Sequence, residues 1–160
     1  MTKKRIAAVS LFIISVLWFI VIFGFSGESS SASDKTSSRA TEVVLGIFIK
    51  GFSDIPESEK AALTAKYNHP IRKIAHFSEY AVLGMLLSLT FLCFGKIKKR
   101  FYLFSVPLSF LLASSDELHQ LFVPGRACRF TDVLLDTSGA AAGALFIFLI
   151  VILFKKKKAL

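Results

Sequence analysis

Ionisable side chains interrupt three apolar segments of this sequence, and their spacing places them on helical faces. In the first segment, Arg72, His76 and Glu79 follow one another at i, i+4 and i+7. Lys73, His76 and Tyr80 are spaced i, i+3 and i+7, so both sets fall on one side of a helix. An ionisable group is costly in lipid and should face protein or trapped water, which makes this stripe a candidate functional site.

The second segment ends in a similar group of polar residues. Asp116, His119 and Gln120 are spaced i, i+3 and i+4, and Glu117 is also a surface neighbour of Gln120 on a helix. A Pro-Gly pair follows at positions 124 and 125 and predicts a turn. The turn leads directly to the third segment.

The third segment opens with two acids and continues with small residues. Asp132, Asp136, Gly139 and Gly143 form a stripe at i, i+4, i+7 and i+11. The Gly-Ala-Ala-Ala-Gly pattern lets a helix approach its neighbour closely. Because the three segments are joined by short connections, we expect their polar stripes to converge on one site.

The predicted site contains basic and acidic groups together. The candidate binding residues are Arg72, Lys73, His76, Glu79, Tyr80, Asp116, Glu117, Gln120, Arg126, Asp132 and Asp136. Arginine and lysine of such a set could hold a phosphate or carboxylate group of a ligand. The structural alternative is that these charges only neutralise one another and lock the helices together.

A membrane enzyme acting on a lipid-linked substrate is a second hypothesis. His76 or His119 could act as a general acid or base, oriented by Glu79 or Asp116. A divalent metal is conceivable on four of the groups, His76, Glu79, Asp116 and Glu117, but the sequence has no established metal spacing such as His-Glu-x-x-His. We therefore predict no metal and no cofactor, and catalytic residues stay unassigned. A proton-coupled transporter is a third possibility, which four spans could form only as an oligomer.

The elements that must position these residues are membrane helices. The chain has 160 residues, of which 54% are hydrophobic, and a mean hydropathy of +0.62, which is too apolar for an ordinary soluble domain. A spanning helix needs about 20 mostly apolar residues. The four segments of this kind are 6–25, 71–94, 101–122 and 133–154. The sequence predicts one all-α domain over residues 1–160, a four-helix transmembrane bundle.

Basic residues predict the orientation of this bundle. They gather in three clusters: Lys3 to Arg5, Lys96 to Arg100 and Lys155 to Lys158. These clusters hold eleven basic residues and no acid, whereas all eleven acids lie in the rest of the chain. By the positive-inside rule both termini are cytoplasmic, and the net charge of +9 does not indicate a nucleic-acid partner. Cys93 and Cys128 then fall on opposite sides of the membrane, so no disulfide is predicted.

The segment 27–70 becomes a long outer loop in this topology. Its Ser-rich first part, residues 26–38, is typical of a flexible segment. Val43, Val44 and Ile47 then follow at helical spacing, and a second short helix should begin at Pro56. We expect a partly helical loop whose helices lie on the outer membrane surface.

The three polar segments together resemble two signatures of the VanZ-like family. The first is RKIAHFSEYAVLG at 72–84, and the second is DELHQLFVPGR at 116–126 followed by DVLLDTSG at 132–139. Phe25-Ser26 at the end of the first span also fits, and the resemblance extends from the first span to the fourth. Asp136 departs from the pattern, because the family usually has asparagine at that position.

The resemblance implies a small multi-pass protein of the bacterial plasma membrane. The founding member of the family is linked to teicoplanin resistance without the enzymes that rebuild peptidoglycan precursors, and no reaction is established for the family. The predicted partners are the lipid bilayer, an envelope lipid or glycopeptide ligand, and a second copy of the chain in a homo-oligomer. The leading expectation is a protein that binds an envelope or lipid-linked ligand in an outer polar pocket, and the resemblance implies a link to glycopeptide resistance.

Overall fold

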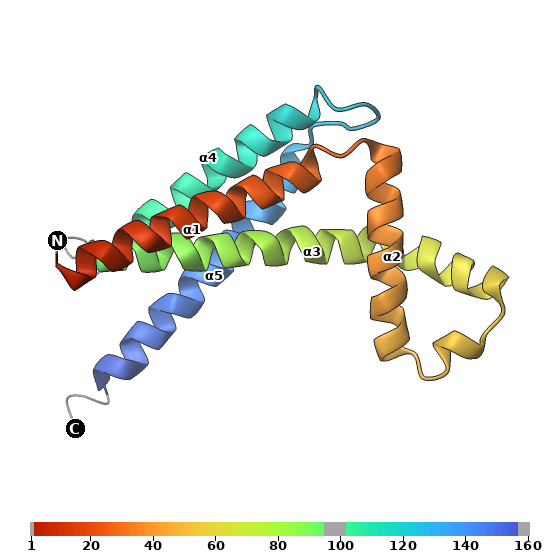
Figure 1. Ribbon diagram of the computed structural model, residues 1–160, viewed down its shortest axis with the longest axis horizontal. Coiled ribbons are helices and arrows are strands. Elements are labelled where there is room, and N and C mark those ends of the chain that lie inside the picture. Colours follow the sequence, from red (N-terminus) through yellow and green to blue (C-terminus); the bar gives the residue numbers. More distant parts are fainter. Residues whose placement is uncertain (1, 95–101, 157–160) are drawn as a thin grey trace.

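The computed structural model describes residues 2–94 and 102–156, and these residues form helices and turns without a strand (Figure 1). The elements are α1 (Lys3–Ser26), α2 (Ser30–Phe48), the 3-10 helix η1 (Phe52–Asp54), α3 (Glu57–Cys93), α4 (Tyr102–Gln120) and α5 (Phe130–Lys156). The predicted all-α class is therefore confirmed.

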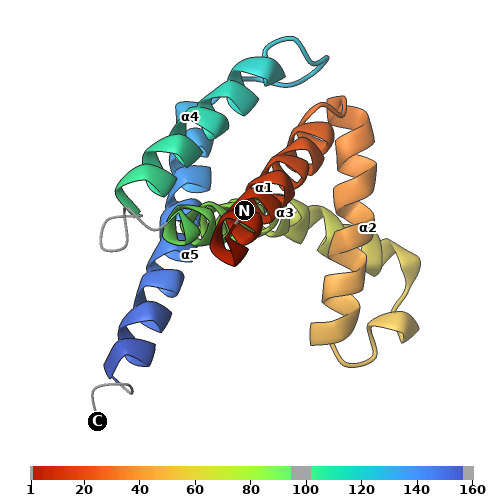
Figure 2. The same ribbon diagram turned by 60° about the vertical axis from the view of Figure 1, so that its left-hand side comes forward.

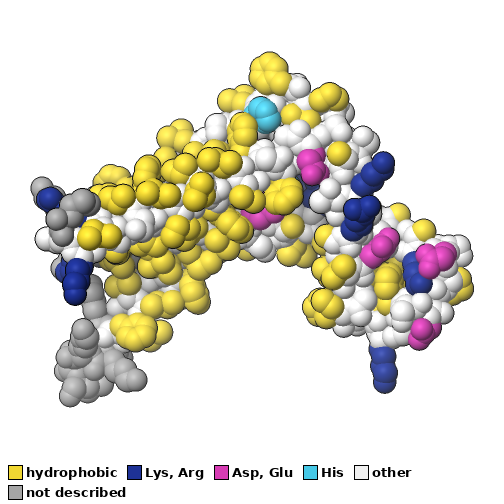
Figure 3. Space-filling view, in the orientation of Figure 1, with side chains coloured by type: hydrophobic (Ala, Val, Ile, Leu, Met, Phe, Trp, Pro, Cys, Tyr) yellow, Lys and Arg dark blue, Asp and Glu magenta, His cyan; other side chains and the backbone are white. Residues whose placement is uncertain are grey.

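Three helices in the described part of the chain are long and apolar enough to cross a membrane: α1, α3 and α5. The surface of α1 and α5 is largely apolar, with Leu17, Ile20 and Leu153 more than half exposed. Figure 3 shows this apolar surface as a broad belt that contains one visible acidic patch, with most of the charged side chains in view beyond its two ends. Such a belt is typical of protein that faces lipid.

The observed helices correspond to the four predicted spans, with different bounds. The third predicted span, 101–122, corresponds to α4, which ends in polar residues and is not among the three helices of sufficient hydropathy. The basic cluster at 96–100 and the lysines at 157 and 158 lie outside the described residues.

The helices α3 and α5 cross in close contact, as the small-residue pattern predicts. A Cβ atom at Gly143 would lie 2.0 Å from the carbonyl oxygen of Ala81, and one at Gly139 would lie 2.2 Å from that of Phe77. From the opposite side, a Cβ atom at Gly84 would lie 2.1 Å from the carbonyl oxygen of Ala140. The glycines let the two backbones touch and set the position of the polar residues on either side of the crossing.

The apolar core lies around this crossing. Its buried members come from four helices: Ile22, Tyr80, Leu83, Leu87, Ala113, Val133 and Ala140. Figures 1 and 2 show the C-terminal half of α5 leaving the other helices. Packing of this core fixes the positions of the helices that carry the polar residues.

The prediction of a flexible Ser-rich loop is wrong, because residues 30–48 form α2. Ser29 caps this helix by accepting a hydrogen bond from the Ala32 backbone N–H at 3.4 Å. Thr41 is buried, and its hydroxyl lies 3.3 Å from Oδ1 of Asn68 on α3. Small hydroxyl side chains let α2 pack against α3, and this tertiary contact stabilises a helix that composition alone does not favour.

The predicted separation between a short outer helix and the second span is also wrong. A helix does begin after Pro56, but α3 runs without interruption from Glu57 to Cys93 and contains Pro70. Proline removes one backbone hydrogen bond inside a helix, which makes it a common boundary. α2 lies against α3 on both sides of the proline, because Thr41 contacts Asn68 and Asp34 contacts Arg72.

Candidate functional site

A cavity of about 220 Å³ lies where α3, α5 and the loop after α4 meet the beginning of α2. Eight of the eleven predicted binding residues line it: Arg72, Lys73, His76, Glu117, Gln120, Arg126, Asp132 and Asp136. The structure therefore brings together most of the three polar stripes.

The loop between α4 and α5 forms one wall of the cavity. Gly125 adopts a φ of 74°, a left-handed conformation that glycine favours, and the Arg126 N–H bonds to the Val123 carbonyl at 3.1 Å. The loop also binds α2, because the Ser30 N–H donates to the Pro124 carbonyl at 3.1 Å. The predicted Pro-Gly turn is confirmed, and it brings Arg126 beside α2.

Two interactions hold acidic residues of the cavity wall near the beginning of α5. Lys73 on α3 forms an ion pair with Asp132 on α5. Glu117 at the end of α4 accepts a hydrogen bond from the Arg129 backbone N–H at 2.9 Å. Both contacts join different elements, so these residues have a structural role as well as a place on the cavity wall.

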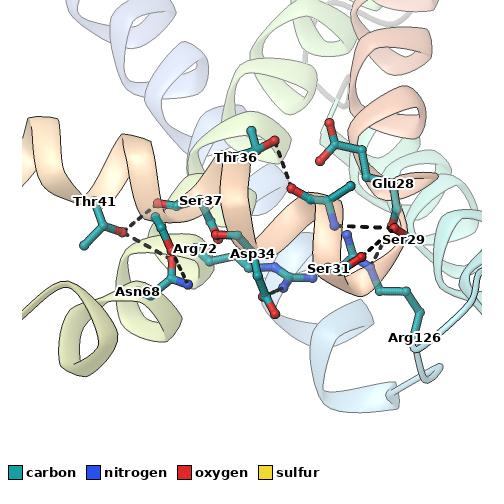
Figure 4. A network of polar contacts seen from close by, with 12 residues as sticks. Glu28, Ser29, Ser31, Asp34, Thr36, Ser37, Thr41, Asn68, Arg72 and Arg126 are labelled. Carbon is teal, nitrogen blue, oxygen red and sulfur yellow. Dashed lines mark hydrogen bonds and ion pairs between the residues drawn. The ribbon is translucent and has the colours of Figure 1, made fainter. Parts of the chain in front are cut away.

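Two arginines approach the first turns of α2 from the other side (Figure 4). A guanidinium nitrogen of Arg72 lies 3.6 Å from Asp34 of α2, which is exposed. Nε of Arg126 donates to the Glu28 carbonyl at 3.2 Å. A backbone carbonyl carries no full charge, and within the described residues Arg126 forms no ion pair. The positive charge of Arg126 therefore remains available in the cavity.

Asp116 and Tyr80 are buried next to the cavity without lining it. One carboxylate oxygen of Asp116 accepts a hydrogen bond from Ser26 at 2.7 Å, and the Tyr80 hydroxyl lies 3.5 Å from the same atom. The other oxygen, Oδ1, has no partner among the described residues, and Oδ1 of Asp136 has none either. Buried polar atoms normally have a partner, and among the described residues Thr64 Oγ1 and His119 Nδ1 are the other buried side-chain atoms without one.

Glu79 lies apart from the cavity and lines a second, more apolar groove of about 180 Å³ between the end of α1, α2 and α3. Its backbone carbonyl accepts a hydrogen bond from the Trp18 indole at 2.9 Å. Arg72, His76 and Arg126 line both the groove and the cavity. These three side chains therefore form the partition between two adjoining spaces.

The four groups of the enzyme hypothesis are divided among different places. His76 and Glu117 line the cavity, Glu79 lines the groove without reaching the cavity, and Asp116 lines neither. His119 stacks on Phe23 with ring centroids 4.3 Å apart and does not line either space. The described residues contain no group of three histidine, cysteine or acidic side chains arranged to hold a metal ion.

Several residues of the site were missed by sequence reasoning. Ser30, His69 and Arg129 line the cavity but are not among the predicted site residues. Ser26 carries a sequence signal, because it belongs to the family-like Phe-Ser pair, whereas Trp18 stands in an apolar run and carries none. Its contact with α3 depends on how the helices pack.

The fold and the site define an all-helical membrane protein with a charged cavity at one end of its helices. The family model described as VanZ/LLP1 matches residues 11–153. The chain belongs to this family, as the signature segments predicted. No curated protein and no solved structure gives a significant match to the chain.

Proposed function

We propose that this VanZ/LLP1 protein binds the anionic head group of an envelope lipid or lipid-linked ligand in its charged cavity. In this proposal the cavity opens in the outer half of the bacterial plasma membrane, and both termini are cytoplasmic. Arginine and lysine suit phosphate and carboxylate groups, which are the common charged groups of such ligands.

The proposed topology has four membrane crossings, and α4 is the one that is not among the three candidate spanning helices. The Ser30–Pro124 hydrogen bond holds the end of α4 on the same side as the beginning of α2. α4 begins at Tyr102, nine residues after α3 ends at Cys93. Its 19 residues extend roughly 28 Å at about 1.5 Å per residue. This length is close to the hydrocarbon thickness of about 30 Å, so α4 is able to cross beside α3 and α5.

The proposal rests on Arg126, which forms no ion pair among the described residues. The guanidinium lines the cavity, is half-buried, and is oriented by the neutral carbonyl of Glu28. Of the other basic residues, Lys73 is already paired with Asp132, and Arg72 is 3.6 Å from an exposed acid. Arg129 also lines the cavity, but it is exposed, so its charge is solvated to a greater extent than that of Arg126. A partly buried arginine without an acidic partner is costly for a membrane protein to maintain. An anionic ligand would supply the missing partner.

The proposed role follows from the family and from this geometry together. A lipoglycopeptide such as teicoplanin carries an acyl tail that enters the outer leaflet. A protein that engages anionic head groups there could limit the access of the antibiotic to its target. We therefore propose a link to glycopeptide resistance through binding of an envelope ligand.

Lipid binding to the purified protein tests the head-group proposal. Native mass spectrometry in nonionic detergent would compare phosphatidylglycerol with phosphatidylcholine, for the wild type and for Arg126→Gln. Loss of a charge-assisted hydrogen bond costs about 1.5–3 kcal/mol, so affinity for the anionic lipid should fall roughly 10- to 100-fold. Lys50→Gln removes an exposed charge outside the cavity and serves as the control. Equal binding of both lipids, or unchanged binding by Arg126→Gln, would overturn the proposal.

A further inference from the structure

The cavity and the groove beside it share Arg72, His76 and Arg126 as lining residues. The two spaces are therefore adjacent, with these three residues at their junction. Each one is smaller than the roughly 300 Å³ at which pockets for whole small molecules begin, whereas the two joined reach that range. This relationship suggests one ligand that occupies both.

The two spaces differ in chemistry. The cavity carries basic and acidic groups from α3, α4, α5 and the intervening loop. The groove adds four apolar lining residues, Phe25, Ala40, Ile71 and Ala75. Phe25 is about half exposed, at 49%, and stands at the end of the apolar helix α1. The groove thus joins the lipid-facing belt on one side and the basic partition on the other.

Hydroxyl side chains from α2 line the groove on the side away from α1 and α3. Ser33, Thr36 and Ser37 belong to this wall, and Thr36 bonds back to the Ala32 carbonyl of its own helix at 3.2 Å. Ser37 likewise donates to the Asp34 carbonyl at 3.2 Å. Hydroxyls bonded within their own helix place no charge on this wall. The acids of the groove, Glu28 and Glu79, come from the turn after α1 and from α3, so an apolar chain would lie along the α2 wall.

We propose that the two spaces form one site for a phosphate-headed lipid, with the phosphate in the cavity and the first part of one hydrocarbon chain in the groove under α2. The inference rests on the proposed function, because it takes the head group from there and adds the chain. Arg72 and Arg126 are then the groups at the junction, where the phosphate of such a lipid meets its chain. The ligand class is an amphiphile of the membrane and not a soluble anion.

Tryptophan substitutions in the groove test binding of the hydrocarbon chain separately from binding of the head group. Ala75 on α3 and Ala40 on α2 are exposed lining residues, so Ala75→Trp and Ala40→Trp fill the groove without overpacking the core. Ala65→Trp and Ala32→Trp place the same side chain at exposed positions of the same helices outside both spaces, and serve as matched controls. Thermal unfolding and helix content by circular dichroism show that each variant is folded.

Binding of phosphatidylglycerol and of a polyisoprenyl phosphate would be measured by native mass spectrometry for each variant. We expect Ala75→Trp and Ala40→Trp to weaken binding of at least one lipid about 10-fold, and the two controls to bind as the wild type does. The lipid with the larger loss identifies the chain type that the groove accepts. Binding that depends on Arg126 but is unchanged by both groove substitutions would overturn this inference alone. If the wild type binds neither lipid, or binds them no better than Arg126→Gln does, both the proposed function and this inference are overturned.

Discussion

The hydroxyl of Ser26 donates a 2.7 Å hydrogen bond to Asp116, and both residues are buried. The bond joins the last residue of α1 to the last turns of α4. The two helices touch at few other places. This single polar contact therefore helps fix how the end of the first helix meets the wall of the cavity.

Removal of this bond should destabilise the protein. Ser26→Ala leaves a buried carboxylate with fewer partners, which costs about 1–3 kcal/mol. Thermal unfolding in detergent should show a lowered midpoint. Ser15→Ala is the matched control, because Ser15 is also a buried serine of α1 but bonds only to the Leu11 carbonyl of its own helix. If both variants unfold at the same temperature, the contact between α1 and α4 contributes nothing.

Close packing of α3 on α5 should be sensitive to one methyl group. In Gly143→Ala the new Cβ atom would meet the Ala81 carbonyl at 2.0 Å, so the backbones must separate. Overpacking typically costs about 1–3 kcal/mol, and a clash with backbone belongs at or above the upper end. Gly24→Ala is the control, because nothing lies within 4 Å of a Cβ atom there. Wild-type stability of Gly143→Ala would show that the two helices do not cross as described.

The ion pair between Lys73 and Asp132 should couple α3 to α5. Lys73→Met and Asp132→Asn should each lower the unfolding midpoint, and the double variant should lose less than the sum. Coupling energies for residues in direct contact are about 0.5–3 kcal/mol. A double-mutant cycle by thermal unfolding measures the value, and additive effects would mean that the two charges do not interact.

Much of this architecture could be predicted from residue spacing. The length of the apolar segments predicted the long helices, and the Gly-x-x-x-Gly pattern predicted the close crossing of α5 with a neighbouring helix. The positions of Arg72 and Asp136 on helical stripes led to a shared cavity. These features depend on local periodicity, which the sequence contains directly.

Other features depend on tertiary contacts and could not be predicted. The Ser-rich segment becomes helical because α2 packs on α3, and Pro70 stays inside α3 for the same reason. Glu79 falls on the predicted stripe but faces a different space from Lys73, because the stripe is wider than one cavity. His119 lies three residues after Asp116, on the same predicted helical face, but its ring stacks on Phe23 of α1.

The proposed topology predicts which residues reagents can reach in intact cells. In a background without the native cysteines, Ser31→Cys and Lys50→Cys should react with a membrane-impermeant maleimide from outside. Thr2→Cys should react only after the membrane is permeabilised. All three positions are exposed in the structure, so burial does not explain a difference between them. The opposite labelling pattern would place the cavity on the cytoplasmic side.

Photo-crosslinking of an anionic lipid tests whether the cavity binds its head group. A phosphatidylglycerol analogue with a photoreactive head group would be bound to the protein, irradiated, and the modified peptides identified by mass spectrometry. Crosslinks are expected in the cavity walls at 69–76 and 125–132, and they should be lost in Arg126→Gln. Crosslinks spread along the exposed face of α1, or unchanged in Arg126→Gln, would mean that the cavity does not bind the head group.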